Sequence, residues 1–584
     1  MMALASGLSA LAARARLAIR SSAAARVAVA LPVGALAGAC VVAMTKVAET
    51  AHVAIYGIPF DERLSAQAHV SFLSALAALC AGGLVLGLLD AWRRRRKAAP
   101  SIDPVEANAL HGGRLSLRDS LLVVFQTVLS NGVGASVGLE AGYAQIGSAL
   151  ASRVGLALRL RREDLRTLVG CGAAGAMAAA FGAPLTGAFY AFELVIGAYS
   201  LGNAAPVLTA AVAGRLTVHV LGGAPYSIEA PPVPPFGVSQ HVALVVLGLV
   251  SALLGVAAMR GAAVLERLVR ASPLPAWARP VVGGVFLASL AAVTPQVLGA
   301  GHGALSLDIP RSMSWSLLIA LIGLKLTASL TSLAFGFRGG LFFASLFVGG
   351  LLGKLYAIAA AYAAPGLDLD STACLFAGMA TLGTTIVGGP LTMAFLVLES
   401  SSDMRVAGPV LAACIASQLT VRAIFGYSFS TWRLHLRGED ISGAQDVGWL
   451  RTLIVARLMD AKPRTMPADA TLAAFRLAHP LGSAHFVALI DRQGRYAGLI
   501  STPEAHASGE EGDPASALAR LADAALRPEQ NIREAMDAFQ INESEVLAVA
   551  DAKGLLVGTL SEAYAARRYA AAIDSAVRGV LGGA

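Results

Sequence analysis

Residues 138–145, GLEAGYAQ, place a single carboxylate, that of Glu140, between two glycines. Apolar sequence lies on both sides, with SLLVVFQTVLSNGVGASV before the motif and IGSALASRVGLAL after it. This context predicts that Glu140 lies at membrane depth. Burying a carboxylate there is unfavourable, so an intramembrane glutamate indicates a transport pathway. The alternative is a glutamate that caps a helix start or pairs with a neighbouring arginine.

The composition is that of a polytopic membrane protein. The 584 residues include 61 glycines and only 14% charged residues, and the mean hydropathy is +0.66, too apolar for an ordinary soluble protein. Glycine or proline interrupts several apolar runs, which predicts broken or re-entrant helices. The runs able to span or partly span a bilayer are Val27–Met44, Val70–Leu89, Val207–Val220, Val242–Ala258, Val281–Leu298, Trp315–Phe335, Leu341–Ala364 and Val406–Ile424.

The net charge of +8 comes with basic clusters at Arg14–Arg26, Arg93–Lys97 and Arg159–Arg166, all beside apolar segments. Positive-inside topology explains this pattern better than nucleic-acid binding does. We therefore expect these loops and both termini in the cytoplasm, and the protein in a cell membrane, the bacterial inner membrane. Residues 1–25 are predicted to form a cytoplasmic or interfacial segment and not a secretory signal.

Enzyme and metal chemistry find no support in the motifs. The sequence contains no HExxH or GxxxxGK[ST], and GASVG at 134–138, which fits GxSxG, lies within an apolar run beside Glu140, so neither a membrane enzyme nor a pump is expected. The five cysteines lie in apolar stretches without CxxC spacing, which predicts packing and neither disulfides nor a metal site. Four isolated histidines are expected at interfaces or in loops: His111, His219, His302 and His435.

A second domain follows a polar linker at residues 438–450. Within residues 451–584, TLAAFRLAH and HFVALIDRQGRYAGLIS predict a helix and two strands, and NIREAMDAFQ and EVLAVADAKGLLVGTLS repeat that order about 60 residues later. Each copy ends with a glycine shortly before a serine, Ser501 in the first and Ser561 in the second.

Three turns that contain glycine or small polar residues precede apolar helices in the membrane domain. Helix N-termini expose unpaired N–H groups and a partial positive charge, so several of them aimed at one point form an anion site without fixed cations. Such a site suits an ion that must also leave. The three turns are PSIDPVEANAL at 100–110, GLEAGYAQIG at 138–147 and RGGLFFASLFVGG at 338–350.

In order and spacing these motifs resemble those of the chloride channel and transporter (CLC) family, over residues 26–437. GLEAGYAQ corresponds to the family's GREGPxxQ. The resemblance makes Glu140 the counterpart of the gating glutamate and implies that Leu139 and Ala141 contribute to anion binding.

The other turns carry the same resemblance. PSIDPVEANAL matches GSGIPEIEGAL loosely and puts Ser101 on the serine that faces the central anion. GGLFFA matches GGxFxP and implies that the backbone amides of Leu341 and Phe342 complete the anion sites. Two PLT turns, at Pro184 and Pro390, mark the paired repeats.

The resemblance implies an all-α polytopic fold of two inverted helical repeats with broken helices, followed by a small α/β domain. The repeated C-terminal unit resembles a tandem cystathionine-β-synthase (CBS) module. The expected partners are the lipid bilayer, a second copy in a homodimer with one pathway per subunit, and chloride or other small monovalent anions.

The gate and the first turn depart from the family pattern. Leu139 stands where the family has arginine, and Gly142 and Ala344 stand where it has proline. Asp103 adds a carboxylate near the inner anion site, where it would repel chloride unless it is paired.

Two further departures concern proton coupling and the central site. In proton-coupled members a second glutamate follows Glu193, and here that position is Leu194, a lost proton relay. The central tyrosine position aligns with Ser430, and a shift of one or three residues would place Phe429 or Tyr427 there instead.

The CBS pair would bind adenine nucleotide through a G-h-h-[TS]-x-x-D ending. The copies end with GLISTPE and GTLSEAY, so Ser501 and Ser561 keep the hydroxyl, while Glu504 and Tyr564 occupy the aspartate position. The CBS pair is therefore expected to be either an adenine-nucleotide site or a dimerising cap that binds no ligand. No other cofactor is expected.

Three functions follow. The first is voltage- or pH-gated, channel-like chloride permeation with weak or no proton coupling, favoured by Leu194. The second is chloride/proton antiport, and the third is a transport-dead membrane receptor regulated by the CBS pair.

Overall fold

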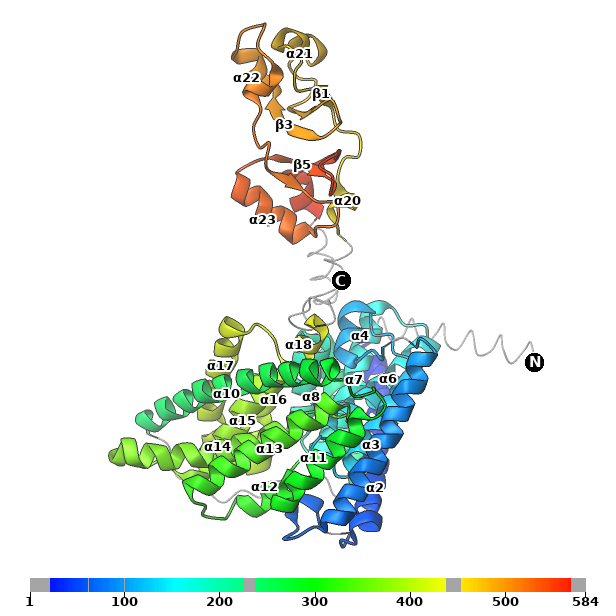
Figure 1. Cartoon of the computed structure of the whole chain (residues 1–584), viewed down its shortest axis with the longest axis vertical. Coiled ribbons are helices and arrows are strands. Elements are labelled where there is room, and N and C mark those ends of the chain that lie inside the picture. Colours follow the sequence, from blue (N-terminus) through cyan, green and yellow to red (C-terminus); the bar gives the residue numbers. More distant parts are fainter. Residues whose placement is uncertain (1–21, 61, 99, 224–236, 437–452, 569–584) are drawn as a thin grey trace, which may run out of the picture. The chain divides into compact units, whose positions relative to one another are not determined.

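The computed structural model describes residues 22–60, 62–98, 100–223, 237–436 and 453–568 (Figure 1). The chain divides into two compact units, Met1–Gln445 and Asp446–Ala584. The first is helical. Among its described residues, six helices are long and apolar enough to cross a membrane.

The first half of the membrane unit begins with two long helices and continues with shorter, broken ones, as the glycine-rich sequence predicts. Its helices are α2 (Ala23–Tyr56), α3 (Phe72–Arg95), α4 (Pro104–Leu110), α5 (Leu117–Gly132), α6 (Glu140–Ala157), α7 (Arg162–Phe181), α8 (Pro184–Tyr190), the π-helical turn η2 (Ala191–Ile196) and α9 (Leu201–Val220).

The second half repeats this pattern of long and broken helices. Its helices are α10 (Val238–Ala271), α11 (Arg279–Val293), α12 (His302–Asp308), α13 (Trp315–Phe335), α14 (Phe342–Ala363), α15 (Ser371–Val387), α16 (Pro390–Ser401), α17 (Met404–Ile424) and α18 (Phe429–His435). Short 3-10 turns lie at Leu64–Ala66, Pro295–Val297 and Pro365–Leu367.

The two halves use the same helix contact. In the first half, Gly147 of α6 lies against the carbonyl of Gly172 in α7, and in the second half Gly349 of α14 lies against the carbonyl of Gly378 in α15. A side chain at any of these four positions would collide with the backbone of the facing helix. Small residues let membrane helices approach closely, and the matched pairs confirm the predicted duplication.

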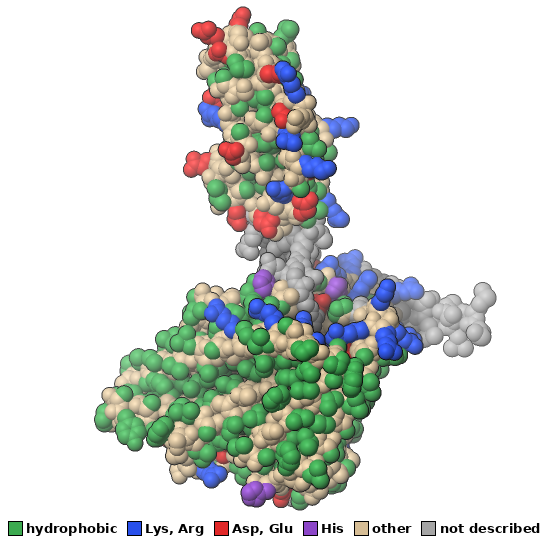
Figure 2. Space-filling view, viewed as in Figure 1, with side chains coloured by type: hydrophobic (Ala, Val, Ile, Leu, Met, Phe, Trp, Pro, Cys, Tyr) green, Lys and Arg blue, Asp and Glu red, His purple; other side chains and the backbone are tan. Residues whose placement is uncertain are grey.

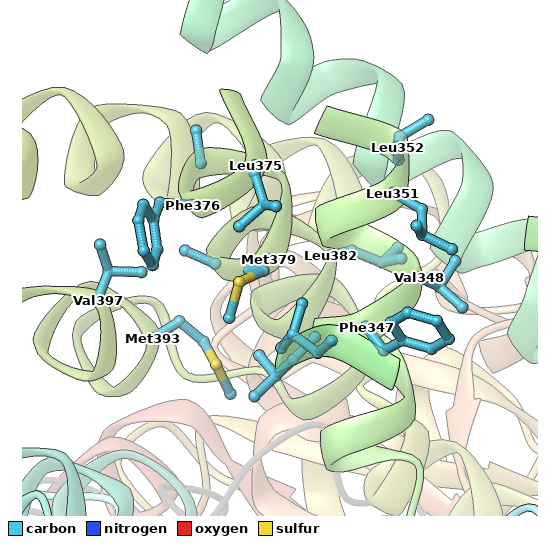
Figure 3. Packing of buried hydrophobic residues seen from close by; sticks show 14 of the residues in the cluster. Phe347, Val348, Leu351, Leu352, Leu375, Phe376, Met379, Leu382, Met393 and Val397 are labelled. Atoms are coloured by element: carbon cyan, nitrogen blue, oxygen red, sulfur yellow. The ribbon is translucent and has the colours of Figure 1, made fainter. Parts of the chain in front are cut away.

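Aromatic and thioether side chains fill the core of the second half (Figure 3). The cluster draws on α14, α15 and α16 and includes the fully buried Phe347, Phe376 and Met393. The centre of the membrane unit is therefore solidly packed around the two closely paired helices.

A glutamate from the second half caps a helix of the first. The Glu399 carboxylate, near the end of α16, accepts hydrogen bonds from the backbone N–H groups of Leu185 and Thr186 and from the Thr186 hydroxyl, all at 2.8 Å. These are the unpaired donors of the first turn of α8, which begins at the first PLT proline.

The reciprocal cap comes from the first half. The Glu193 carboxylate accepts from the N–H groups of Leu391 (2.9 Å) and Thr392 (2.8 Å) and from the Thr392 hydroxyl (2.6 Å), at the start of α16. Each repeat thus satisfies the helix start of the other, and the two halves are joined by six charge-assisted hydrogen bonds.

Hydrophobic side chains cover the side of the membrane unit, and Lys and Arg gather along one edge of it (Figure 2). Leu253 and Leu268 of α10 and Phe286 of α11 are among the large hydrophobic residues that are exposed. A contiguous apolar belt with a basic edge is the surface expected of a protein in a bilayer.

The C-terminal unit is a duplicated α/β structure, which confirms that part of the predicted fold class. Strand β2 (Phe486–Ile490) pairs in parallel with β1 (Thr465–Pro467) and antiparallel with β3 (Tyr496–Ser501). Strand β5 (Val546–Ala550) does the same with β4 (Ala525–Leu526) and β6 (Leu556–Ser561). The helices are α20 (Val455–Leu458), α21 (Leu472–Ala478), α22 (Thr502–Ala507) and α23 (Ile532–Asn542), and a 3-10 turn lies at Ala515–Leu518.

Candidate anion site and gate

Two backbone hydrogen bonds bring the starts of α6 and α14 together. The Gly138 N–H donates to the Gly340 carbonyl at 3.0 Å, and the Gly340 N–H donates to the Gly138 carbonyl at 3.2 Å. The GLEAG and RGGLF turns, about two hundred residues apart in sequence, therefore meet side by side. Each then leads directly into a long helix.

Neither of these two helices has a side-chain cap. Their N-cap residues, Leu139 in α6 and Leu341 in α14, make no side-chain cap hydrogen bond. Neighbouring helices do have such caps, including α5 at Ser116, α13 at Ser314 and α15 at Asp370. The starts of α6 and α14, with their partial positive charge, are thus not capped by their own N-cap side chains.

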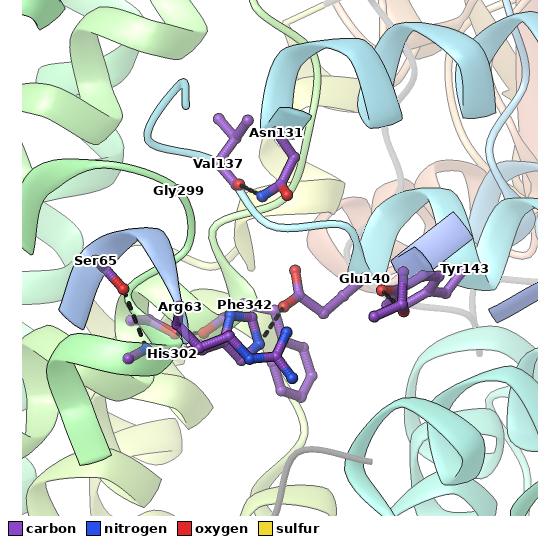
Figure 4. Close-up of polar contacts among 12 residues, drawn as sticks. Arg63, Ser65, Asn131, Val137, Glu140, Tyr143, Gly299, His302 and Phe342 are labelled. Atoms are coloured by element: carbon purple, nitrogen blue, oxygen red, sulfur yellow. Dashed lines mark hydrogen bonds and ion pairs between the residues drawn. The ribbon is translucent and has the colours of Figure 1, made fainter. Parts of the chain in front are cut away.

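The Glu140 side chain folds back over this junction. It is only 4% exposed, and its Oε2 atom has no hydrogen-bond partner in the described structure. The carboxylate lies so close to Gly138 that any side chain at residue 138 would collide with it. Its other oxygen, Oε1, lies 3.9 Å from Nε2 of His302 (Figure 4). The carboxylate is thus buried with few polar partners.

Ser101 lies beside the same junction. Its hydroxyl oxygen accepts a hydrogen bond from Arg338 at 2.9 Å, which leaves its own proton available to donate. The Gln145 side chain of α6 donates to the Ile102 carbonyl at 3.0 Å and ties the Ser101 loop to the gate helix. Asp103 proves to be the N-cap of α4, accepting from the Glu106 N–H at 2.8 Å.

The remaining predicted anion-site residues lie around the two helix starts. Leu139 and Leu341 are buried N-cap residues, Phe342 is the buried first residue of α14, and Ala141 is exposed on α6. A methyl group at Gly340 would lie 3.6 Å from Ala141 Cβ, which places Ala141 directly opposite the second turn.

The structure does not bring Ser430 to the site. Ser430 is exposed on α18, whereas Phe429 packs against the cluster that contains Leu341 and Ala344 at the start of α14. One residue along a helix turns a side chain by about 100°, so the two cannot share a direction. Tyr427 is engaged elsewhere, with its hydroxyl 3.1 Å from His435 Nδ1.

Tyr190, at the end of α8, was not identified from the sequence. Its ring packs against the same buried cluster as Ile102 and lies 6.3 Å, centroid to centroid, from Phe342. No hydrogen bond joins its hydroxyl to another described residue, and the hydroxyl is not fully enclosed. The phenol O–H is therefore available to donate a hydrogen bond.

Leu194, at the lost relay position, lies half-buried in η2 with Cδ2 close to Gly388. The only acid of η2 is Glu193, and its carboxylate is committed to the start of α16. At the position of the lost proton relay the chain thus has a leucine side chain, and the neighbouring carboxylate of Glu193 caps α16.

A cavity of about 400 Å³ is lined by Glu140 together with residues of α2 and of the turn before α12. Its wall carries Lys46, His52, Arg63 and His302, and Arg63 pairs with Glu49 at 2.7 Å. His302 begins the short helix α12 and lines this cavity, so it does not lie in a loop. The signal in the sequence was GAGH immediately before a short helix, since glycines of this kind let a turn approach a neighbouring helix closely.

The nucleotide ending in the C-terminal unit is partly occupied by protein contacts. Glu504 forms an ion pair with Arg520, and the Ser561 hydroxyl accepts from the Tyr564 N–H at 3.4 Å. Ser501 begins α22 without making a side-chain cap.

Comparisons with known proteins identify the family of the chain. The family described as "Voltage gated chloride channel" matches residues 81–422. A "putative chloride channel protein ClcB-like" from Ralstonia nicotianae is 31% identical over 59% of this chain and 81% of its own length.

Two solved structures share the fold. A slow cyanobacterial Cl⁻/H⁺ antiporter has a TM-score of 0.59 and 22% identity over 70% of this chain and 97% of its own. A eukaryotic CLC transporter has a TM-score of 0.58 and 17% identity over 92% and 97%. With the family match covering more than half of the residues, this chain belongs to the voltage-gated chloride channel (CLC) family.

Proposed function

We propose that the protein moves chloride and other small monovalent anions across the membrane, through the junction of α6 and α14, with Glu140 as the gate. The observation that carries this proposal is the Glu140 carboxylate lying over two uncapped helix starts. The carboxylate and a chloride ion compete for the same N–H groups. Protonating Glu140 removes the competitor, so acid conditions open the path.

The anion is bound by single N–H and O–H donors and not by a bidentate side chain. Ser101 supplies a hydroxyl, Leu341 and Phe342 supply backbone amides, and Tyr190 supplies the phenol that α18 does not. Single N–H and O–H donors suit chloride, bromide and nitrate, whereas sulfate and phosphate favour bidentate partners. Monovalent anions should pass and divalent ones should not.

Channel-like permeation with weak or no proton coupling is the function that the relay region supports. Proton transfer through an apolar segment needs a titratable group or an ordered file of water, and Leu194 supplies neither. The second candidate is chloride/proton antiport, the activity of the cyanobacterial protein that shares the fold. A transport-dead receptor is the third, and the intact gate and Ser101 argue against it.

We further propose a homodimer with one pathway in each subunit, in the bacterial inner membrane with both termini cytoplasmic. Exposed apolar residues of α9 and α17 support an interface between subunits; they include Val212, Leu216, Val220, Ile415 and Leu419. For the C-terminal pair, the Glu504–Arg520 ion pair favours a dimerising cap over an adenine nucleotide site.

The deciding experiment measures chloride and proton flux together on purified protein in liposomes. Wild-type protein should release chloride faster as the external pH falls, while a chloride gradient drives little proton movement. Glu140→Gln should remove the pH dependence, and the exposed Glu62→Gln should keep it. Wild-type pH dependence in Glu140→Gln would exclude Glu140 as the gate, and uphill proton movement that Glu140→Gln abolishes would establish antiport.

A further inference from the structure

We propose that His302 is the outer partner of the Glu140 carboxylate, drawing it off the anion site when the imidazole becomes charged. The proposal rests on the proposed gating role of Glu140 and adds the group that receives the carboxylate when the gate opens. His302 is thus assigned as a positioning residue of the gate.

Two buried side chains hold the backbone on either side of His302. Lys325, buried in α13, donates to the carbonyls of Val297 (3.1 Å) and Gly299 (2.7 Å), just ahead of α12. The Ser65 hydroxyl accepts from the N–H groups that follow His302, at residues 303 (3.1 Å) and 304 (3.2 Å). The turn cannot easily carry the imidazole away from the gate.

The ring itself is fixed against the start of α14. It stacks on Phe343 with the centroids 3.6 Å apart and the planes 21° apart. Phe343 is fully buried and follows Phe342, one of the residues whose amides are proposed to bind the anion. The imidazole therefore faces the gate from a rigid platform.

Glu140 and His302 line the same cavity, and a small movement of either side chain would bring them into direct contact. Their closest atoms are 3.9 Å apart, too far for a hydrogen bond but close enough for a small side-chain rotation to form one (Figure 4). His302 keeps 27% of its side chain exposed, against 4% for Glu140. The histidine is thus the member of the pair that meets protons first from the cavity.

The surrounding charges set when the imidazole becomes charged. Burial lowers the pKa of the His302 imidazole most, and the positive charges of Arg63, which is paired with Glu49, and of Lys325 lower it further. Lys46 and His52 from α2 line the same cavity, and the Tyr143 hydroxyl of α6 is held by Thr45 at 2.7 Å. The nearby anion that favours the imidazolium is the Glu140 carboxylate itself. Charging therefore requires acid, and it attracts the carboxylate outward.

The cavity faces the outside if the positive-inside rule holds. Helix α3 ends in the basic cluster that begins at Arg93, and α12 lies at the opposite end of the membrane unit from α4 and α18 (Figure 1). External acid is then sensed twice, by His302 and by Glu140.

The test is chloride efflux from liposomes as a function of external pH, with folding checked by size exclusion. His302→Gln and His302→Phe, the second of which keeps the stack on Phe343, should move half-maximal flux to lower pH by about one unit, a tenfold change at a given pH. The pH curve should also become less steep, because one proton-binding group is lost. His302→Lys should restore high flux at pH 7.5, and the exposed His69→Gln should behave as wild type.

Each outcome decides the matter. Curves for His302→Gln and His302→Phe that coincide with wild type or move to higher pH would overturn the proposal, as would wild-type flux at pH 7.5 in His302→Lys. If Glu140→Gln is pH-insensitive while the His302 variants keep the wild-type curve, only this inference fails. If Glu140→Gln keeps the pH dependence, the proposed gate itself fails.

Discussion

Alanine at Gly138 should displace the Glu140 carboxylate and hold the gate open. A methyl group there would lie 2.7 Å from Glu140 Cδ and 2.8 Å from Oε1, and closer still to Oε2. Since carbon atoms rest about 3.5–4.0 Å apart, the carboxylate carbon must retreat by about 0.8 Å or more. Gly138 is not among the residues with positive φ, so the backbone accepts alanine. The flexible carboxylate moves and the helix stays.

The size of the effect follows from the cost of overpacking, which is typically about 1–3 kcal/mol. Because 1.4 kcal/mol is a factor of ten, occupancy of the site by the carboxylate should fall by about 5- to 140-fold. Chloride efflux from Gly138→Ala liposomes at pH 7.5 should then approach that of acidified wild type, with a flattened pH dependence.

A matched control is Gly340→Ala, across the same backbone bridge. Its methyl group would lie 3.6 Å from Ala141 Cβ and 3.8 Å from Glu140 Oε2, both ordinary contacts. The control should keep the wild-type pH dependence. Gly138→Ala protein that keeps both the wild-type efflux at pH 7.5 and the wild-type pH curve would refute the placement of the carboxylate.

Three further predictions test other parts of the structure. Glu399→Gln should lower the free energy of unfolding by about 2–3 kcal/mol, because a neutral amide cannot accept from all three donors at the start of α8. The melting temperature of this variant in detergent should fall, whereas that of the exposed Glu529→Gln should not. An unchanged melting temperature in Glu399→Gln would contradict the reciprocal cap. Tyr190→Phe should weaken chloride binding measured by calorimetry severalfold without loss of folding, and unaltered affinity would remove the phenol from the site. Leu194→Glu should newly allow a chloride gradient to drive protons uphill, and the same lack of coupling in variant and wild type would show that another element blocks the proton path.

The sequence placed several predicted site residues correctly because they depend on short motifs. Glu140, Leu341 and Phe342 follow glycine turns that open helices, and in the structure they lie where the starts of α6 and α14 meet. Ser101 was predicted by the same reasoning and lies beside that junction. Asp103 was expected as a problem for chloride, but its carboxylate serves as the cap of α4.

The sequence motifs could not predict which residues contact the other repeat. Glu399 lies in an ordinary apolar helix, and only the fold shows that it caps α8 from the other half. His302 appeared isolated in the sequence, and Tyr190 was not identified from it. The residues that they approach, Glu140 and Phe342, lie more than a hundred positions away along the chain. The choice between Phe429 and Ser430 needed the actual rotation of α18.

By itself the sequence determined the class of protein, the duplication of the membrane domain and the C-terminal α/β pair, because hydropathy, periodicity and glycine turns are local properties of the chain. Only the tertiary structure decided which helix starts remain uncapped, which carboxylates are used as caps and which side chains face the gate. Those outcomes depend on where distant segments meet in space, and a donor or acceptor is free or engaged only with respect to the neighbours that folding brings to it.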